Sequence, residues 1–263
     1  MFTLVQKKQK KSCVAMKSIP VLTEKDIWKL EKSLSRLAQD KYLTTGLPFI
    51  TLKYAQTLDG KIATLTGNSR WISGSSSLGF AHRIRSLNDA ILVGVNTIIR
   101  DNPRLTVRLA KGKNPKRIIV DSRLRTPLDS NVLQGRSALS TIIATTSLSD
   151  QERIKRIHST GAEVWLIKKD RFNQVDLRYL LKELAQRNIS FLLVEGGSKI
   201  ITSFLKKRLA DRLVVIMAPK IVGKGMNCVR SSSSRGFKKL LSFSSLRYFR
   251  SGDDVILEAL ISK

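Results

Sequence analysis

Residues 90–108 read AILVGVNTIIRDNPRLTVR, and this stretch decides the fold. Its first part, Ala90–Val95, is a short apolar run that favours a strand buried on both faces. A short helix is expected next, in which Thr97 and Asp101 lie four residues apart and share one face. Asn102-Pro103 then predicts a turn. A buried strand that leads straight into a helix is the building unit of a parallel α/β sheet.

The same alternation continues on both sides of this stretch. Short apolar runs predict further strands at Phe49–Thr57, Arg117–Asp121, Thr141–Thr145, Ala162–Ile167, Phe191–Glu195 and Leu213–Ala218. Helical stretches lie among them at Ser75–Leu87, Leu148–Ser159, Val175–Arg187 and Ser198–Lys206. The pattern predicts an α/β fold with a mostly parallel sheet flanked by helices. At the end, Phe243–Phe249 and Val255–Ile261 flank Ser251-Gly252-Asp253-Asp254, which predicts a C-terminal antiparallel hairpin.

The N-terminal part has a different character, so we divide the chain into an extension, residues 1–46, and a domain, residues 47–263. Residues 1–22 are polar, basic and aperiodic, and we expect them to be loosely attached. Thr23-Glu24-Lys25-Asp26 resembles a capping box with Asp in place of the usual Glu. Apolar residues at helical spacing then predict one amphipathic helix over about residues 24–41, whose apolar stripe must dock on the rest of the protein.

The net charge is the unusual feature of the composition. The 263 residues include 48 Lys and Arg against 20 Asp and Glu, giving +28. Such a field attracts polyanions and phosphorylated metabolites. Only 6% of residues are aromatic, and the sequence has no interleaved stacking platform. Nucleic acid is therefore not expected as a partner, and a basic bias of the whole proteome would explain the charge equally well.

Other classes of protein find little support. Cys13 and Cys228 cannot build a disulfide framework, and neither cysteines nor histidines stand at metal-ligand spacing, so no metal site is expected. His82 and His158 are interpreted as packed or solvated residues. No apolar run approaches the ~18 residues that span a bilayer, and no signal peptide is recognisable. The expected location is cytoplasmic, with no membrane contact.

Two candidate loops follow the first predicted strand, one at the turn Asp59-Gly60 and one over residues 67–75. The strand Phe49–Thr57 places Lys53 and Ala55 on one face before it turns at Asp59-Gly60. Residues 67–75, GNSRWISGS, precede a helix that carries arginines. Ser73 or Ser75 could cap that helix and leave its N-terminus open to an anion. Trp71 could stack on a ring or simply cover the core, and a strand lysine is usually solvated.

A further loop, Glu195-Gly196-Gly197-Ser198, follows a predicted strand and opens a helix. Bare backbone N–H groups and the helix N-terminus both favour an anion there. The pattern is neither GxGxxG nor a Walker loop, so no nucleotide-binding label follows from it. With residues 97–108, these segments make four loops at strand ends, where open α/β sheets bind ligands. From the residues alone we predict a phosphorylated small molecule as ligand, with a dinucleotide as one option, and no particular reaction.

The motifs, taken in order, resemble the reductase domain of riboflavin biosynthesis, the C-terminal half of the bifunctional deaminase/reductase. The resemblance covers about Pro48 to Leu260 and rests on five segments: Lys53 to Lys61, Ser69–Ser73, Val93–Arg108, Asp121-Ser122 and Glu195–Ser198. It implies a dihydrofolate-reductase-like fold, usually a homodimer. It also implies NADPH as cofactor and reduction of a 5-phosphoribosylamino-pyrimidine to the ribitylamino-pyrimidine phosphate, as in 5-amino-6-(5-phosphoribosylamino)uracil reductases.

The same resemblance implies roles for individual positions. The cofactor-contacting positions are Ala55, Trp71, Thr97, Asp101, Ser122, Gly196, Gly197, Ser198, Lys199, Ile200, Ile201, Thr202 and Ser203. The substrate-contacting positions are Ser69, Arg85, Leu105, Arg108 and Glu195. Lys53 and Asp101 lie near the reacting carbon, where either would supply a proton directly or through water. Arg85 and Arg108 would bind the 5′-phosphate of the substrate.

The resemblance leaves the substrate open. The upstream zinc deaminase of the bifunctional enzymes carries H-x-E and P-C-x-x-C, which are absent here. Either the deaminated uracil or the non-deaminated diaminopyrimidinone therefore fits. One alternative is a paralogue that reduces another pyrimidine- or pteridine-like compound. An alternative from another class is a non-catalytic polyanion-binding protein on the same fold.

Overall fold

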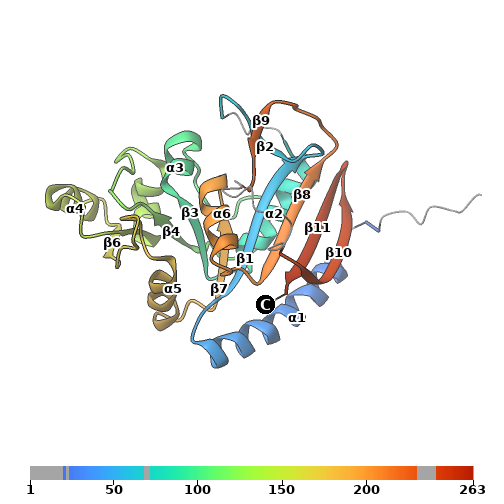
Figure 1. The fold of residues 1–263 in the computed structure, drawn as a ribbon, viewed down its shortest axis with the longest axis horizontal. Helices are drawn as coiled ribbons and strands as arrows, with labels where there is room; N and C mark the ends of the chain where they lie inside the picture. Colours follow the sequence, from blue (N-terminus) through green and yellow to red (C-terminus); the bar gives the residue numbers. More distant parts are fainter. Residues whose placement is uncertain (1–19, 22–23, 68–71, 230–240, 263) are drawn as a thin grey trace, which may run out of the picture.

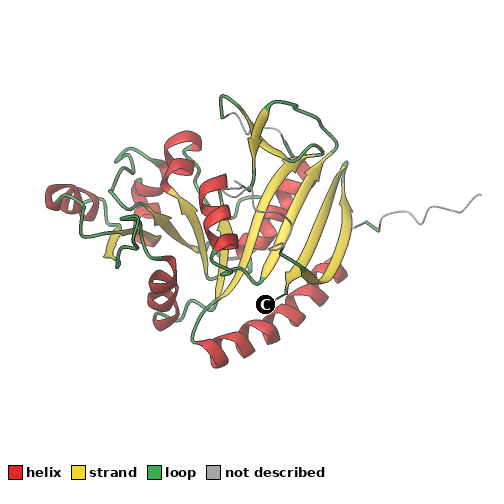
Figure 2. Ribbon diagram, viewed as in Figure 1, coloured by secondary structure: helices red, strands yellow, loops and turns green. Residues whose placement is uncertain are grey.

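A nine-stranded sheet forms the centre of the protein (Figures 1 and 2). The structure, a computed structural model, describes residues 20–21, 24–67, 72–229 and 241–262, and within the first helix only the side chains from residue 34 onward. The strand order is β10-β11-β8-β1-β7-β3-β4-β5-β6. In chain order the strands are β1 (Phe49–Thr57), β3 (Ala90–Gly94), β4 (Lys116–Val120), β5 (Thr141–Thr145), β6 (Glu163–Leu166), β7 (Phe191–Glu195), β8 (Arg212–Ala218), β10 (Phe243–Ser251) and β11 (Asp254–Ile261).

The pairing of these strands confirms the predicted fold class. From β8 across to β6 every neighbouring pair is parallel. β10 and β11 form an antiparallel hairpin, and β11 pairs antiparallel with β8. The hairpin therefore extends the same sheet, which gives the dihydrofolate-reductase-like arrangement that the sequence resemblance implied.

Helices cover both faces of the sheet, because its strands are apolar on both sides. On one face, Leu180 of α5 (Leu177–Gln186) and Phe204 of α6 (Ser198–Lys206) pack into a core that includes Leu92. On the other face, Phe80 of α2 (Ser75–Ser86) and Ile98 of α3 (Val95–Asp101) pack into a core with Ile91. Neighbouring residues of β3 thus serve opposite cores, as the two-residue period of a strand requires. Helix α4 (Gln151–His158) and two 3-10 turns, η1 (Asn131–Leu133) and η2 (Gly135–Ser140), complete the second face.

Helix α1 (Glu24–Thr45) extends four residues beyond its predicted end and lies along one end of the sheet (Figure 1). Leu34 and Ala38 pack against Phe49. Lys41 pairs with Asp211, a buried carboxylate that also accepts the backbone N–H of Ile50 at 2.8 Å. The predicted apolar stripe therefore docks on the domain. The division of the chain after residue 46 stays a prediction, and the proposed capping box includes residues outside the described part.

The N-terminal segment also touches the far edge of the sheet. The backbone N–H of Arg250 on β10 donates to the Pro20 carbonyl at 2.7 Å, and Val21 forms an isolated parallel bridge with the same residue. These two residues are therefore paired rather than loosely attached. The pairing partly covers an edge strand, which would otherwise present unpaired backbone groups.

One local feature was not predicted, and one local expectation was wrong. The sequence pattern misses a two-stranded ribbon, β2 (Lys61–Thr64) with β9 (Gly225–Asn227), because strands this short carry no readable alternation. Neither Ser73 nor Ser75 caps α2. Gly74 occupies the N-cap position without a side-chain cap, and its backbone N–H donates to Asp254 Oδ2 at 2.8 Å. A carboxylate from the hairpin thus already serves this helix N-terminus.

Within the described part of the chain, no helix is long and apolar enough to cross a membrane.

Candidate active site

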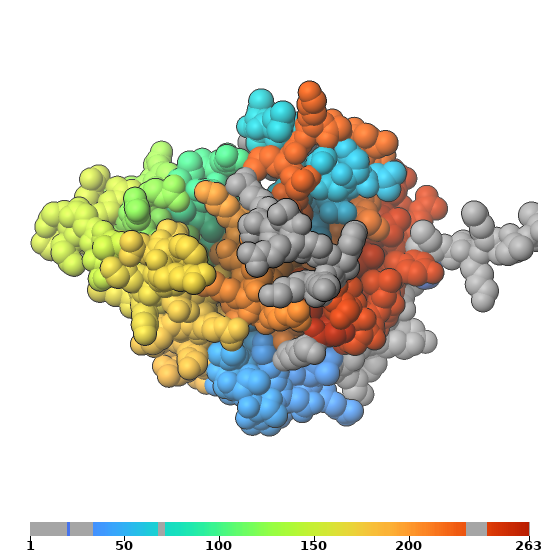
Figure 3. Space-filling view, viewed as in Figure 1, coloured from blue at the N-terminus to red at the C-terminus, as the bar shows by residue number. Residues whose placement is uncertain are grey.

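A cleft of about 560 Å³ opens above the carboxyl ends of β1, β3 and β7. Parallel strands present these ends at one edge of the sheet, where the loops that follow them converge. The cleft is bordered on one side by α3 and α6 and on the other by the β2–β9 ribbon, whose segments gather at the top of the face shown in Figure 3. The lining residues that the sequence singled out are Lys53, Ala55, Arg85, Thr97, Asp101, Leu105, Glu195, Gly196, Gly197, Ser198, Lys199 and Ile200.

The floor of the cleft carries a cluster of three charged side chains that are largely buried. β1 and β7 pair in parallel with Lys53 opposite Glu195, so the sheet register itself brings these two residues together. Lys53 Nζ lies 4.0 Å from Glu195 Oε1. Arg85, from α2, donates from Nε to Oε1 at 3.1 Å and from Nη2 to Oε2 at 2.8 Å. Charge-assisted fork contacts of this kind hold both side chains in one geometry.

Burial and charge act against each other in this cluster. Burial alone would raise the pKa of Glu195, but the adjacent Arg85 and Lys53 outweigh it and lower that pKa to about 2. Burial lowers the pKa of Lys53, and the attraction of Glu195 offsets this only in part. The carboxylate is therefore held ionised, while the ammonium group releases its proton more readily than an exposed lysine does. A lysine in that state suits proton donation inside a closed site.

Arg85 already has protein partners in this structure. Its guanidinium was expected to clamp a phosphate, but Glu195 already occupies the fork, and the remaining Nη1 donates to the Thr106 carbonyl at 3.2 Å. A phosphate would have to displace a buried carboxylate from this arginine. In this structure Arg85 thus binds Glu195 and the loop that contains Thr106, and its contact with the substrate phosphate stays a prediction.

Arg108 is better placed to meet a phosphate, although it does not line the cleft itself. Its side chain is exposed and donates from Nη1 to Thr106 Oγ1 at 2.9 Å. Burial, followed by the positive charges of Arg85 and Arg104, lowers its pKa. The positive charges of Arg104 and of Arg85, which lies on the cleft floor, therefore both act on Arg108. The sequence reasoning missed Arg104, although its position four residues before Arg108 within one motif was a usable signal.

The glycine loop and α3 meet as their sequences suggested. Thr97 Oγ1 accepts the backbone N–H of Gly197 at 3.3 Å. Gly196 has a φ of +128°, and a Cβ at this position would lie 3.0 Å from Thr97 Oγ1, so both backbone conformation and space favour glycine. Helix α6 begins at Ser198 with no side-chain cap at Gly197. Its N-terminus therefore faces the cleft with backbone amides, the arrangement that suits an anion.

A second cavity, also about 560 Å³, adjoins the first and shares Asn96, Lys199 and Ile200 with it. The predicted cofactor positions Ser122 and Ser203 line this second cavity, not the first. Its other lining residues are largely basic or apolar: Val95, Val120, Arg123, Arg125, Asp170, Phe172, Gln174, Val175, Leu177, Lys206 and Lys207. The two cavities thus meet at α3 and at the N-terminal half of α6, and the second has a basic lining that suits negative charge.

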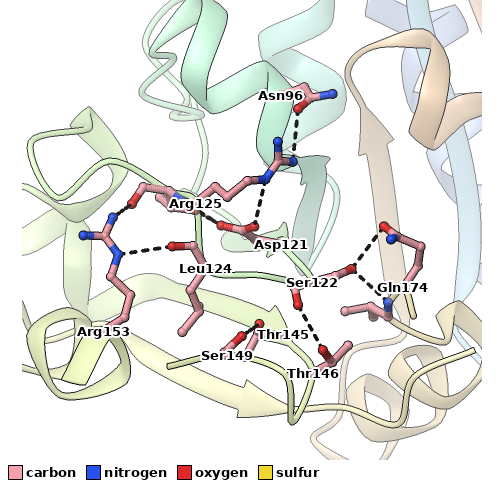
Figure 4. Close-up of polar contacts among 12 residues, drawn as sticks. Asn96, Asp121, Ser122, Leu124, Arg125, Thr145, Thr146, Ser149, Arg153 and Gln174 are labelled. Atoms are coloured by element: carbon pink, nitrogen blue, oxygen red, sulfur yellow. Dashed lines mark hydrogen bonds and ion pairs between the residues drawn. The ribbon is translucent and has the colours of Figure 1, made fainter. Parts of the chain in front are cut away.

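Hydrogen bonds fix one wall of the second cavity (Figure 4). Ser122 Oγ accepts the backbone N–H of Val175 at 3.0 Å and lies 3.4 Å from Gln174 Oε1. Thr146 Oγ1 donates to the Ser122 carbonyl at 2.9 Å. Arg125 Nη2 donates to Asn96 Oδ1 at 3.2 Å, which links this wall to α3 and the first cavity.

Some predicted positions fall elsewhere. Ile201 is fully buried in the core, and Thr202 is buried as well, so neither side chain lines either cavity. They lie on the inner face of α6 because a helix presents only part of its circumference to a cleft. Ser69 and Trp71 lie outside the described residues. Tyr54, Asn96, Arg100 and Met226 line the first cavity without having been predicted. The first three lie within the motif segments but were not singled out, whereas Met226 lies outside all of them.

Comparison with known proteins decides the family. A sequence model of the RibD C-terminal domain matches residues 48–257. The chain belongs to the RibD C-terminal domain family. The sequence resemblance to the reductase domain of riboflavin biosynthesis is thereby confirmed. Riboflavin biosynthesis protein RibD of Aquifex aeolicus (strain VF5) is 40% identical over 237 residues, which are 89% of this chain and 64% of that protein.

Two further relatives define the extent of the match. The Aquifex aeolicus protein named 2,5-diamino-6-ribosylamino-4(3H)-pyrimidinone 5′-phosphate reductase is 39% identical over 218 residues, 80% of this chain and 95% of that protein. The structure of Acinetobacter baumannii RibD (form 1) superposes with a TM-score of 0.76 at 25% identity, covering 90% of this chain and 65% of that one. The chain thus spans less than two thirds of these RibD proteins, and nearly all of the named reductase.

Proposed function

We propose that this member of the RibD C-terminal domain family reduces a 5-phosphoribosylamino-pyrimidine to the ribitylamino-pyrimidine phosphate in riboflavin biosynthesis, with NADPH as the cofactor. The observation that carries the proposal is the pair of adjoining cavities. One holds the buried Lys53–Glu195–Arg85 cluster with Asp101 at its rim, and the other is lined by Arg123, Arg125, Lys206 and Lys207.

The residues present fit a phosphorylated dinucleotide. Gly196 has no side chain to keep a ligand away from its backbone, and the uncapped start of α6 provides backbone amides for a diphosphate. The basic lining of the second cavity suits the extra phosphate that distinguishes NADPH from NADH. When bound, the cofactor supplies the hydride, and this chain supplies orientation and proton transfer.

The substrate chemistry suggests tasks for several charged residues in and beside the first cavity. The ribosylamine opens to an imine at ribose C1′; a hydride adds to that carbon and the imine nitrogen gains a proton. Lys53 or Asp101 supplies the proton, directly or through water. Glu195, held ionised, accepts hydrogen bonds from substrate hydroxyl or amino groups. Arg108, with Arg104 beside it, binds the 5′-phosphate.

A direct assay tests the proposal. Purified full-length chain is incubated with NADPH and, in separate reactions, with the deaminated uracil and the non-deaminated diaminopyrimidinone, while loss of NADPH absorbance is recorded. We expect turnover with at least one of them and weaker use of NADH. Absence of turnover with both, together with tight and salt-sensitive DNA binding, would replace the enzyme by the polyanion-binding alternative. The homodimer and the cytoplasmic location stay predictions, and light scattering tests the first.

A further inference from the structure

The loop that carries Arg108 is held in place by side chains from outside the loop. Leu105, within it, is buried and adopts a left-handed φ of +52°, which is unfavourable for a residue with a side chain. The buried Arg117 of β4 donates from Nε to the Arg104 carbonyl at 3.0 Å. Asn114 Oδ1 accepts the N–H of Val107 at 2.7 Å. The loop therefore has a defined shape that its own backbone preferences would not maintain.

His82 makes the contact closest to Arg108. This side chain is only 4% exposed, and its Nδ1 accepts the backbone N–H of Arg108 at 2.8 Å, with the N–H of Leu109 at 3.4 Å. His82 stands three residues before Arg85 on α2, so both project from one face of the helix toward the same loop. Because Nδ1 accepts a backbone hydrogen, it carries no proton itself, and the neutral ring holds its hydrogen on Nε2.

An anchor at this point restricts where the Arg108 guanidinium can lie. An arginine side chain loses rotamer entropy when it is immobilised, and a free backbone would add to that cost. With its N–H fixed to His82, Arg108 starts from a constrained Cα and reaches the neighbourhood of Arg85 and Arg104. Misplacement of such a group by about 1 Å can cost a large factor in rate or binding.

We propose that His82 is a positioning residue for the substrate phosphate, acting through the backbone of Arg108. The sequence reasoning treated this histidine as a packed or solvated residue, and no motif marked it. The inference rests on the proposed function for the identity of the substrate, but not for the anchoring contact itself.

Two amide substitutions distinguish the loss of the hydrogen-bond acceptor at Nδ1 from the loss of the imidazole ring itself. In His82→Asn the amide oxygen can stand near the position of Nδ1, whereas in His82→Gln the amide reaches the position of Nε2. We expect His82→Gln to raise the KM for the phosphorylated pyrimidine by about tenfold and to leave the KM for NADPH unchanged. His82→Asn should stay close to the wild type. His158→Gln, the same change at an exposed histidine of α4, is the matched control.

A double substitution tests whether His82 acts through Arg108. If it does, His82→Gln combined with Arg108→Ala binds the substrate no more weakly than Arg108→Ala alone. If the losses in substrate binding caused by the two substitutions add in full, the residues act independently, and the proposal is overturned. So would an unchanged KM in His82→Gln, or an equal loss in both amide variants that extends to NADPH and to thermal stability.

A binding measurement keeps this test separate from the proposed reaction. Ribose 5-phosphate titrated into the unmodified chain and into each variant reports on the phosphate contact without any turnover. If the wild type oxidises no NADPH with either pyrimidine, the proposed function fails, yet weaker ribose 5-phosphate binding in His82→Gln than in His82→Asn still supports the anchor. Nitrogen NMR of the wild type, in which only two histidines need assignment, must show the Nε2–H form for His82; an Nδ1–H form overturns it.

Discussion

Glu195 faces Arg85 with both of its oxygens, at 3.1 Å from Nε and 2.8 Å from Nη2, inside the first cavity. Both side chains are expected to contact the substrate, and the structure shows that they are also paired with each other. Replacing Arg85 by Met leaves the Glu195 carboxylate buried without its main counter-charge. We expect the free energy of unfolding to fall by about 3 kcal/mol, measured by urea denaturation.

The matching control for this pair is the double variant. Arg85→Met with Glu195→Gln removes the stranded charge as well, so it should recover part of the lost stability. A double variant less stable than Arg85→Met alone would contradict a role for the pair in holding the carboxylate ionised.

Lys53 and Asp101 are proposed to act on the proton rather than on the cofactor. Lys53→Met and Asp101→Asn should each lower kcat by about a hundredfold or more. The Kd for NADPH, measured by fluorescence titration in the absence of substrate, should change much less. Equal losses in turnover and in NADPH binding would remove the proton-transfer role from the residue concerned.

The environment of His82 predicts a loss of stability on mild acidification. Burial, followed by the charges of Arg85 and Arg108, lowers its pKa from 6.5 to about 4, with Lys53 adding to the shift and Glu195 opposing it. The unfolded chain therefore gains a proton at a higher pH than the folded chain does. The contribution of His82 to the free energy of unfolding is therefore complete above pH 6.5 and is lost as the pH falls from 6.5 toward 4.

Urea unfolding at several pH values from 7 to 4 checks this sign. Other acidic groups contribute to the curve, so the informative quantity is its difference from the curve of His82→Asn, which lacks the titrating ring. The difference should shrink steadily below pH 6.5. If the curves of the wild type and His82→Asn run parallel, His82 carries the same charge in the folded and unfolded states between pH 7 and 4.

Gly196 offers a test of the cofactor cradle. An alanine there would adopt a φ of +128° and bring its Cβ to 3.0 Å from Thr97 Oγ1. We expect Gly196→Ala to lower the free energy of unfolding by about 1–3 kcal/mol and to weaken NADPH binding. Gly79→Ala, in α2 with open space around the added Cβ, should instead stabilise by about 0.5–1 kcal/mol. Similar effects of the two substitutions would contradict this account.

The N-terminal extension is expected to matter for stability and not for catalysis. Deletion of residues 1–22 removes the short pairing with β10 and should leave kcat/KM unchanged. Lys41→Met removes the partner of the buried Asp211 carboxylate and should cost about 3 kcal/mol in unfolding free energy. Asp40→Asn, on an exposed position of the same helix, is the control for Lys41→Met. A deletion variant that folds but is inactive would show that the extension contributes to the site.

Local patterns predicted well where burial repeats along the chain. The strands Phe49–Thr57, Thr141–Thr145 and Phe191–Glu195 and the helix Ser198–Lys206 have the predicted bounds, because each has an apolar face or a fully apolar run next to a clear turn. The β2–β9 ribbon and the cap of α2 were not predictable in this way. The ribbon is too short for a period, and the cap comes from Asp254, which lies 180 residues away in the sequence.

The sequence by itself determined the order of strands and helices, the loops that gather at one edge of the sheet, and the family. All of these depend on information that is local along the chain or that recurs in motifs. Only the tertiary structure decided which distant residues meet: that Arg85 binds Glu195 and that His82 accepts the backbone N–H of Arg108. It also decided that Ser122 lines a second cavity. The pairing of strands that lie far apart in the sequence and the rotation of α2 about its axis set these contacts, and neither follows from the spacing of residues within any one segment.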